Sequence, residues 1–400
     1  MRTTRRQLLQ GAVGSSGLLL LNCASRGAAA PAADAGSDAA SGVCADAFAG
    51  GTLAGEVPIL SAGTAPLDTA FGAGLDGRLY TDLSKLTADM PTTPTDRFYL
   101  RTRYPDLLDP NAPWKIAVHG LVASDVDLTL ADLDALAVPM GVHVMECSGN
   151  GDFSHFGMLG AADWSGVPLA DLLAKKASVS PSATRVLVSG FDSYSVTPSN
   201  SVQGASWIFS LDELAQTRAF LARTMNGAPL TPDHGFPVRL MVPGWYGCTC
   251  IKWVNEIALV DDSAPATSQM TEYASRTMQN GTPALARDFA SASIDQAAMP
   301  VRIEKWNVAG AVVYRVIGVM WGGSTPSDAL SIRFNPDLPF DHVDVCPPAS
   351  SNATWTWWSY AWRPASAGTY EIRLKVDDPA VRQRRLDSGF YARKVAIADV

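Results

Sequence analysis

The pattern of apolar residues changes near Ser293, and this change constrains the fold more than any other feature. Up to Leu285, strand-like and helix-like patterns alternate irregularly. After Ser293 only strand-like runs follow, at 301–306, 312–320, 330–334, 355–362 and 370–376. Short strands separated by turns are typical of an immunoglobulin-like β-sandwich. The sequence therefore predicts an α+β domain over residues 81–290, followed by an immunoglobulin-like sandwich over residues 291–400.

Within the α+β region the sequence places individual elements. Helical patterns cover 129–136 and 167–177, and strand patterns cover 114–122, 142–146, 185–189, 236–242 and 251–260. Thr129 is a good N-cap, and Ser210 with Glu213 has the spacing of a capping box. These patterns leave the order of the strands within the sheet open.

The first thirty residues have the features of a twin-arginine export signal. Arg5 and Arg6 precede a modest apolar stretch, and Ala28-Ala29-Ala30 offers a cleavage site of small residues. We expect a signal peptide over residues 1–30, a periplasmic protein, and a flexible leader over residues 31–80. An N-terminal membrane anchor, or a lipid on Cys23, is the alternative. Because the twin-arginine route carries folded proteins, often with a cofactor already inserted, the signal favours a bound cofactor.

The charge balance and the hydropathy argue against two classes of protein. The chain has 31 basic and 39 acidic residues and a formal net charge of −8, whereas a nucleic-acid-binding surface needs Lys and Arg to neutralise phosphates. Outside the N-terminus no apolar run approaches the roughly 18 residues that span a bilayer. The sequence therefore predicts neither a nucleic-acid-binding nor a membrane-spanning body.

Six cysteines are present, and one of them stands apart. No Cys-x-x-Cys and no Cys-x-x-Cys-His occurs, so no c-type haem or iron–sulfur cluster is expected in this chain. Cys147 follows a strand pattern and precedes the turn-forming run 148–151. Such a thiolate is a good soft ligand for a redox metal, although a buried free cysteine is the alternative. The pairing of the remaining thiols stays open, with Cys44–Cys346 as one weak option and Cys248 and Cys250 unassigned.

Several basic residues lie close in sequence to Gly-rich, flexible backbone. Arg239 lies in one strand pattern and Lys252 begins the next, with a Gly-rich connection between them. Two cations beside free backbone N–H groups suit a phosphate, although two solvated strand charges are the alternative. Three more cations, Arg97, Arg101 and Arg103, lie beside aromatic residues. The alternative is that they form the exposed side of an amphipathic edge strand.

Several motifs occur in one order along the α+β region. They are Phe98-Tyr99-Leu100-Arg101, Cys147-Ser148-Gly149-Asn150, Trp164-Ser165-Gly166-Val167-Pro168-Leu169, Met225-Asn226-Gly227, the run 234–239, and Pro243-Gly244 through Lys252-Trp253. In this order they resemble the sulfite oxidase family of molybdopterin enzymes. The resemblance implies a sulfite-oxidase-like molybdopterin-binding domain, molybdenum-molybdopterin as cofactor, and a C-terminal immunoglobulin-like domain that forms a homodimer.

The resemblance also implies roles for single residues. Cys147 would bind molybdenum, Arg101 would face the substrate oxyanion, and Tyr273 would match the family's active-site tyrosine. The cofactor would be held by Tyr99, Leu100, Arg101, Thr102, Arg103, Cys147, Asp192, His234, Arg239, Cys250, Ile251 and Lys252.

The implied activity is oxygen-atom transfer on a sulfur compound, as in a sulfite dehydrogenase. Since this chain has no haem motif, electrons would pass to an external c-type cytochrome. A molybdenum reductase acting on a sulfoxide or related oxo-acceptor is one alternative. An exported binding or scaffold protein that keeps the fold without catalysis is another.

The sequence departs from the family pattern in two places. Gly151 and Asp152 stand where sulfite-oxidising members have two arginines, and Thr102-Arg103 replaces an Asn-His pair. Asp152 near the pocket would repel a dianion such as sulfite, and together with His155 it could change the choice of substrate. An ordinary exposed loop is the equal alternative.

Overall fold

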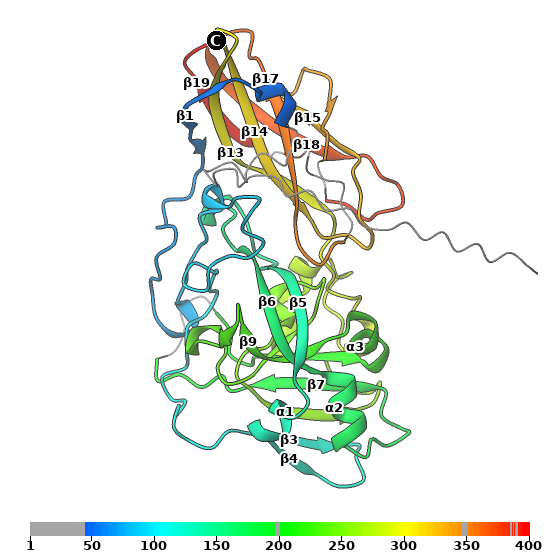
Figure 1. The fold of residues 1–400 in the computed structure, drawn as a ribbon. Helices are drawn as coiled ribbons and strands as arrows, with labels where there is room; N and C mark the ends of the chain where they lie inside the picture. Colours follow the sequence, from blue (N-terminus) through cyan, green and yellow to red (C-terminus); the bar gives the residue numbers. More distant parts are fainter. Residues whose placement is uncertain (1–44, 197–200, 346–350, 385, 387, 389–390) are drawn as a thin grey trace, which may run out of the picture. The chain divides into compact units, whose positions relative to one another are not determined.

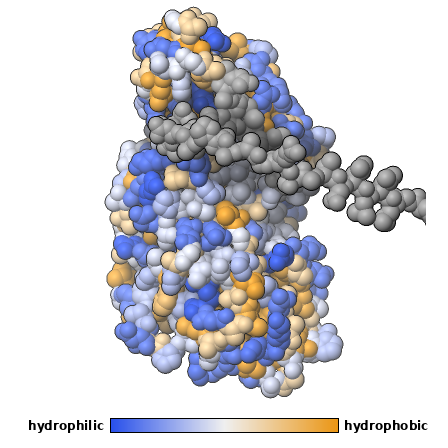
Figure 2. Space-filling model, in the orientation of Figure 1, coloured by the Kyte–Doolittle hydropathy of each residue, from blue (hydrophilic) through white to orange (hydrophobic). Residues whose placement is uncertain are grey.

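Strands predominate over helices in the described part of the chain, and they form four sheets (Figure 1). The computed structural model describes residues 45–400 except 197–200, 346–350, 385, 387, 389 and 390, all of which belong to the second of the chain's two units, Ala39–Val400. The expected signal peptide, Cys23, Cys44 and Cys346 lie outside the described residues. Among the described residues no helix is long and apolar enough to cross a membrane. On the face drawn in Figure 2, hydrophilic and hydrophobic side chains are mixed.

One sheet of the α+β region has the order β4-β3-β12-β7-β8. Its strands are β3 (Lys115–Gly120), β4 (Val126–Thr129), β7 (Arg185–Gly190), β8 (Ser206–Ser210) and β12 (Val254–Val260). β12 runs parallel to β3 and antiparallel to β7. The last strand of this region therefore lies between two earlier ones. The side chains of Ile116, Val186 and Ile257 are completely buried, and they form part of the core.

Two short helices begin directly at strand ends because the sequence caps them. Thr129 accepts a hydrogen bond from the Asp132 N–H at the start of α1 (Leu130–Asp134), and Ser210 does the same for Glu213 in α3 (Leu211–Thr217). In both cases the acidic side chain returns a bond to the N-cap backbone, which makes two complete capping boxes. Both sites were expected from the sequence, and the structure confirms them.

The second sheet of this region holds β5, the strand that leads into Cys147. Its strands are β5 (Val138–Glu146), β6 (Leu159–Pro168), β9 (Phe220–Met225), β10 (Ala228–Pro229) and β11 (Arg239–Met241), in the order β10-β9-β6-β5 with β11 on β9. The helix expected over 167–177 is α2 (Leu169–Lys176). It starts later because Val167 and Pro168 still pair with β9.

Residues after 293 form two antiparallel sheets, as their strand patterns predicted. The first has the order β1-β13-β14-β17, with β1 (Thr52–Val57), β13 (Ala297–Val308), β14 (Ala311–Trp321) and β17 (Thr356–Trp362). The second has the order β16-β15-β18-β19-β2, with β2 (Ile59–Leu60), β15 (Leu330–Arg333), β16 (Asp341–His342), β18 (Gly368–Val376) and β19 (Arg393–Ile397). Trp358 is fully buried, and a Cβ on Gly318 would lie 2.1 Å from its ring. This contact explains the glycine in the middle of β14.

The prediction of a flexible leader over residues 31–80 is wrong for the part that the structure describes. β1 pairs with β13, and β2 pairs with β19. Five of the six residues of β1 are exposed, because it is an edge strand held by backbone hydrogen bonds. An edge strand of this kind leaves no alternation of buried and exposed apolar residues, which is why the sequence pattern missed it.

Candidate active site

Cys147 lies immediately after β5, in a loop that is held by hydrogen bonds of the Cys147 backbone. Its N–H donates to the Met158 carbonyl at 3.0 Å, and its carbonyl accepts from the Asn150 N–H at 2.9 Å. The thiol is free and buried, and burial raises its pKa. A metal that displaces the thiol proton would therefore bind it as a fixed, desolvated thiolate.

The Cys147 side chain borders a cavity that encloses about 850 Å³ of empty space, part of it open to solvent. This is within the usual size range of cofactor sites. Most of the residues that the sequence assigned to the site line this cavity together: Tyr99, Leu100, Arg101, Thr102, Cys147, Asp192, Arg239, Cys250, Ile251, Lys252 and Tyr273. The fold thus gathers side chains from six separate stretches of the chain.

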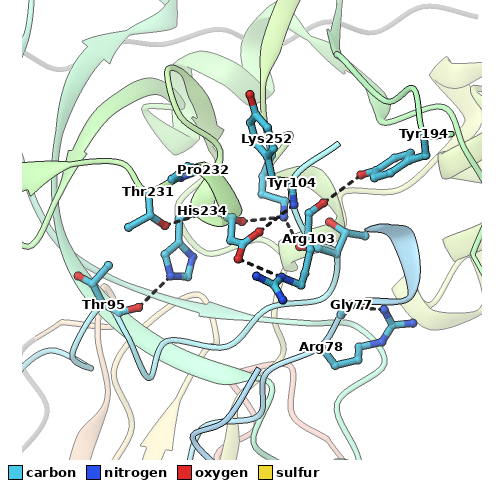
Figure 3. Close-up of polar contacts among 12 residues, drawn as sticks. Gly77, Arg78, Thr95, Arg103, Tyr104, Tyr194, Thr231, Pro232, His234 and Lys252 are labelled. Carbon is cyan, nitrogen blue, oxygen red and sulfur yellow. Dashed lines mark hydrogen bonds and ion pairs between the residues drawn. The ribbon is translucent and has the colours of Figure 1, made fainter. Parts of the chain in front are cut away.

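His234 and Arg103 do not line this cavity, and Figure 3 shows the polar contacts of both residues. The His234 Nε2 lies 2.9 Å from the Thr95 carbonyl, and burial lowers the pKa of His234 to about 4. A carbonyl only accepts, so Nε2 carries the proton and Nδ1 is an acceptor. Arg103 forms an ion pair at 3.2 Å with Asp233, which does line the cavity.

Two cations line the cavity: Arg239, which is buried, and Lys252, which is half-buried. Lys252 donates from Nζ to the carbonyls of Thr102 at 2.6 Å and Asp233 at 2.9 Å. Arg239 donates to the Met145 sulfur at 3.0 Å. Burial lowers the pKa of both groups, and that of Lys252 strongly. Among the described residues neither cation has a carboxylate within 4.0 Å, the usual limit for a salt bridge. Because unpaired buried charges are costly, an anion is needed here.

Asp192 borders the cavity and also fixes backbone. Its Oδ2 accepts from the N–H groups of Gly204 at 2.6 Å and Ala205 at 3.0 Å. The carboxylate therefore holds the chain that leads into β8.

A second cavity, with about 520 Å³ of empty space, lies on the other side of Arg101 and is rich in arginine. Its lining residues are Arg78, Tyr80, Arg101, Gly149, Phe153, Met158 and Arg276. A Cβ on Gly149 would lie 3.9 Å from the Arg276 Nη1 and 4.0 Å from the Cys147 sulfur. Gly149 thus leaves room between an arginine and the thiol, where a small anion would fit.

The three arginines are held in different ways. Arg78 donates from Nη1 to the carbonyls of Leu75, Gly77 and Arg101, so it braces the backbone that carries Arg101. Arg101 donates from Nη1 to the Ser201 hydroxyl at 3.0 Å. The guanidinium carbon of Arg276 lies 5.1 Å from the ring centre of Tyr273.

Sequence reasoning missed Arg78 and Arg276. Arg276 follows Tyr273 by three residues, just after α4 (Ser268–Tyr273), and that spacing places both on one helical face. This signal was available. Arg78 lies in a turn-rich segment, and no local pattern connects it to the site.

The expectation that Asp152 repels a dianion at the pocket is wrong. Asp152 lines neither cavity, because its carboxylate is bound elsewhere. It lies 2.9 Å from the Arg393 guanidinium of β19 and accepts from the Ser61 hydroxyl at 2.9 Å and the Ala62 N–H at 2.8 Å. His155 also lines neither cavity, and its Nε2 lies 3.2 Å from the Ala65 carbonyl.

Comparisons with known proteins identify a molybdopterin-binding region in this chain. Residues 102–268 match the family model described as the oxidoreductase molybdopterin binding domain. The mitochondrial sulfite oxidase of Drosophila melanogaster is 30% identical over 200 residues, which are 47% of this chain and 34% of that protein. The sulfite oxidase of Gallus gallus is 27% identical over 205 residues, 48% of this chain and 44% of that protein. The chain therefore contains a molybdopterin-binding oxidoreductase domain that is similar to that of the sulfite oxidases.

A nitrate reductase and a sulfane dehydrogenase are also similar to this chain. The NADPH nitrate reductase of Mycosarcoma maydis is 30% identical over 212 residues, 45% of this chain and 21% of that protein. The chain thus spans less than half the length of these curated relatives. Its fold is similar to the crystal structure of the sulfane dehydrogenase SoxCD from Paracoccus pantotrophus, with a TM-score of 0.61, 16% identity, and coverage of 86% of this chain and 91% of that chain.

The residues of this site fit molybdenum-molybdopterin. Two buried polar atoms near the cavity, the His234 Nδ1 and the Arg239 Nε, have no partner among the described residues. A pterin would supply donors and acceptors for such atoms, and its phosphate would supply the anion that Arg239 and Lys252 need. Cys147 would supply the thiolate for the metal.

Proposed function

We propose that this chain is a periplasmic molybdopterin-dependent oxidoreductase that performs oxygen-atom transfer on a small sulfur oxyanion, as a sulfite dehydrogenase does. One observation carries the proposal: Arg101 and Arg276 border a cavity beside the Cys147 sulfur, and neither has a carboxylate partner among the described residues. The relatives named sulfite oxidase and the sulfane dehydrogenase of similar fold support a sulfur compound as substrate.

In this mechanism the bound cofactor supplies the two-electron oxygen-atom chemistry that side chains cannot perform. The chain binds and orients the substrate. Arg101 and Arg276 hold the anionic oxygens by charge-assisted hydrogen bonds, and Arg78 fixes the Arg101 backbone. Burial raises the pKa of Tyr273, so its hydroxyl stays protonated and donates a hydrogen bond to a substrate oxygen. Oxidation of sulfite takes one oxygen from water and releases two protons and two electrons.

The electrons need an acceptor, and we propose an external c-type cytochrome, as the missing haem motif suggests. We also propose that residues 291–400 form an immunoglobulin-like sandwich that makes a homodimer. Their two antiparallel sheets support this. Sedimentation that yields only monomer over a wide concentration range would contradict the dimer.

A substrate comparison on the molybdenum-loaded enzyme tests the proposal. With ferricyanide as electron acceptor, we expect sulfite to be oxidised and the rate constant kcat/KM to fall as salt screens the arginine-lined cavity. With reduced methyl viologen as donor, we expect dimethyl sulfoxide and nitrate to be turned over much more slowly. Rapid reduction of dimethyl sulfoxide with no oxidation of sulfite would favour the reductase instead.

The scaffold alternative fits the site poorly. A binding protein without a cofactor has no need of two unpaired, partly or fully buried cations beside a buried thiol, because each cation costs folding free energy. The absence of both turnover and molybdenum would nevertheless support it.

A further inference from the structure

Glu146, the last residue of β5 and the neighbour of Cys147, is almost completely buried and yet charged. Three side chains donate to its carboxylate. Arg384 binds both oxygens through its two Nη atoms, with 2.8 Å to Oε1. The Trp321 Nε1 donates to Oε2 at 2.8 Å, and the Asn150 amide donates to Oε1 at 3.3 Å. The carboxylate therefore joins three segments that are far apart in the sequence.

Two of these donors come from the C-terminal strands. Trp321 ends β14, and Arg384 lies in the segment between β18 and β19. That segment is fixed to the start of β13, because the Gln296 N–H donates to the Arg382 carbonyl at 3.0 Å and the Arg384 N–H donates to the Gln296 carbonyl at 3.1 Å. The Arg384 guanidinium is therefore held from the C-terminal side before it contacts Glu146.

The guanidinium is also packed between aromatic rings. Its carbon lies 5.7 Å from the ring centre of Trp321 and 5.5 Å from that of Tyr246. Tyr246 directly precedes residues 247–250, three of which border the cofactor cavity. Cation–π contacts of this kind restrict where a guanidinium can lie.

The third donor leads to the thiol loop. Besides its bond to Glu146, Asn150 accepts the Met158 N–H through its side-chain oxygen at 3.0 Å, and it donates its backbone N–H to the Cys147 carbonyl. Glu146 therefore supports the backbone of Cys147 in two ways. It precedes Cys147 directly in the chain, and its carboxylate binds Asn150, whose N–H in turn binds the Cys147 carbonyl. A shift of the Glu146 carboxylate would move both supports of the thiol.

We propose that Arg384 and Glu146 form a positioning pair, through which the C-terminal strands fix the place of the Cys147 thiolate. The proposal rests on the assignment of Cys147 as the metal ligand. A buried ion pair is by itself weak support for stability, since apolar replacements of similar size are often tolerated. A role in placing a neighbouring ligand gives this pair a function that packing would not serve.

The chain offers a matched control in Arg393. It also belongs to the C-terminal strands, its side chain is also nearly buried, and it also pairs with a residue of the loop after Cys147, namely Asp152 at 2.9 Å. However, the Asp152 side chain has no hydrogen bond to Cys147, Asn150 or Glu146 among the described contacts. Removing Arg393 therefore breaks a similar pair without touching the supports of the thiol.

The first readout needs neither cofactor nor substrate. In cofactor-free protein, alkylation of Cys147 by iodoacetamide is followed by peptide mass spectrometry, which separates it from Cys248 and Cys250. We expect Arg384→Met to raise the rate at least about tenfold over wild type, since a released loop exposes the thiol. Arg384→Lys keeps the charge but loses the two-pronged contact, so it should give an intermediate rate. Arg393→Met should label like wild type.

The second readout uses the loaded enzyme. At equal molybdenum content, the Mo(V) EPR signal and the midpoint potential should shift in Arg384→Met and stay unchanged in Arg393→Met, because a ligand that turns alters the metal's electronic structure. A purely structural role would lower stability without these shifts.

Several outcomes would overturn the proposal. One is labelling of folded Arg384→Met at the wild-type rate, or an equal increase in Arg393→Met. If Arg384→Met does not fold, the Glu146→Gln/Arg384→Met double variant removes both charges and is tested in the same way. Failure of both variants to fold would assign the pair to folding and contradict a positioning role. Faster labelling in a protein that takes up no molybdenum would refute the proposed function and leave the role of the pair intact.

Discussion

Replacing Cys147 by serine is expected to reduce turnover by at least about 10³-fold, the scale of loss seen when a central catalytic group is removed. A serine hydroxyl is a hard and weakly acidic oxygen donor, whereas the redox metal needs a soft thiolate. The buried site at the end of β5 offers no other cysteine on the same loop. The measurement is kcat for sulfite with ferricyanide as acceptor.

The melting temperature of the same Cys147→Ser preparation serves as the control. Serine is smaller than cysteine but similar in shape, so we expect the protein to stay folded. Retention of wild-type kcat in the folded variant would remove Cys147 from the catalytic site. It would also remove the reason for placing the metal there.

The second large effect is expected at Arg101, which borders both cavities. Arg101→Gln should lower kcat/KM for sulfite about 10²-fold, since charged hydrogen bonds to a substrate contribute roughly 1.5–3 kcal/mol each. Arg276→Gln should act in the same direction, mainly through KM, because its guanidinium lies farther out and is exposed. Steady-state kinetics at low ionic strength measures both.

Arg97 provides the matched control for these arginines. It lies four residues before Arg101 but borders neither of the two cavities. Arg97→Gln should therefore leave kcat/KM within about twofold, as expected for a change away from the site. An equal loss in Arg97→Gln and Arg101→Gln would point to general electrostatic steering. It would contradict direct binding of the substrate by Arg101.

Local patterns predicted the parts of the fold that depend on neighbouring residues. The capping boxes at Thr129 and Ser210 are examples, because each needs only two residues three positions apart. The strand-only C-terminal region is another, because buried side chains alternate with less buried ones there, as in β15. Cys147 was also visible, since a strand pattern and a turn-forming run surround it.

Features that depend on distant partners could not be predicted in this way. Asp152 appeared to be a pocket residue because it follows Cys147 closely. Its carboxylate is instead bound by Arg393, 241 residues later, and by the segment around Ser61, 91 residues earlier. Arg78 braces Arg101 across 23 residues of irregular chain. In each case the partner is set by tertiary packing, which leaves no periodic signal in the sequence.

The central claim is that this chain carries molybdenum-molybdopterin at Cys147. Elemental mass spectrometry on protein made in a host that synthesises molybdopterin tests it most directly. We predict close to one molybdenum per chain, with loss of the metal in Cys147→Ser. A value near zero, while a related enzyme loads normally in the same host, would contradict the claim and favour a protein that keeps the fold without the cofactor.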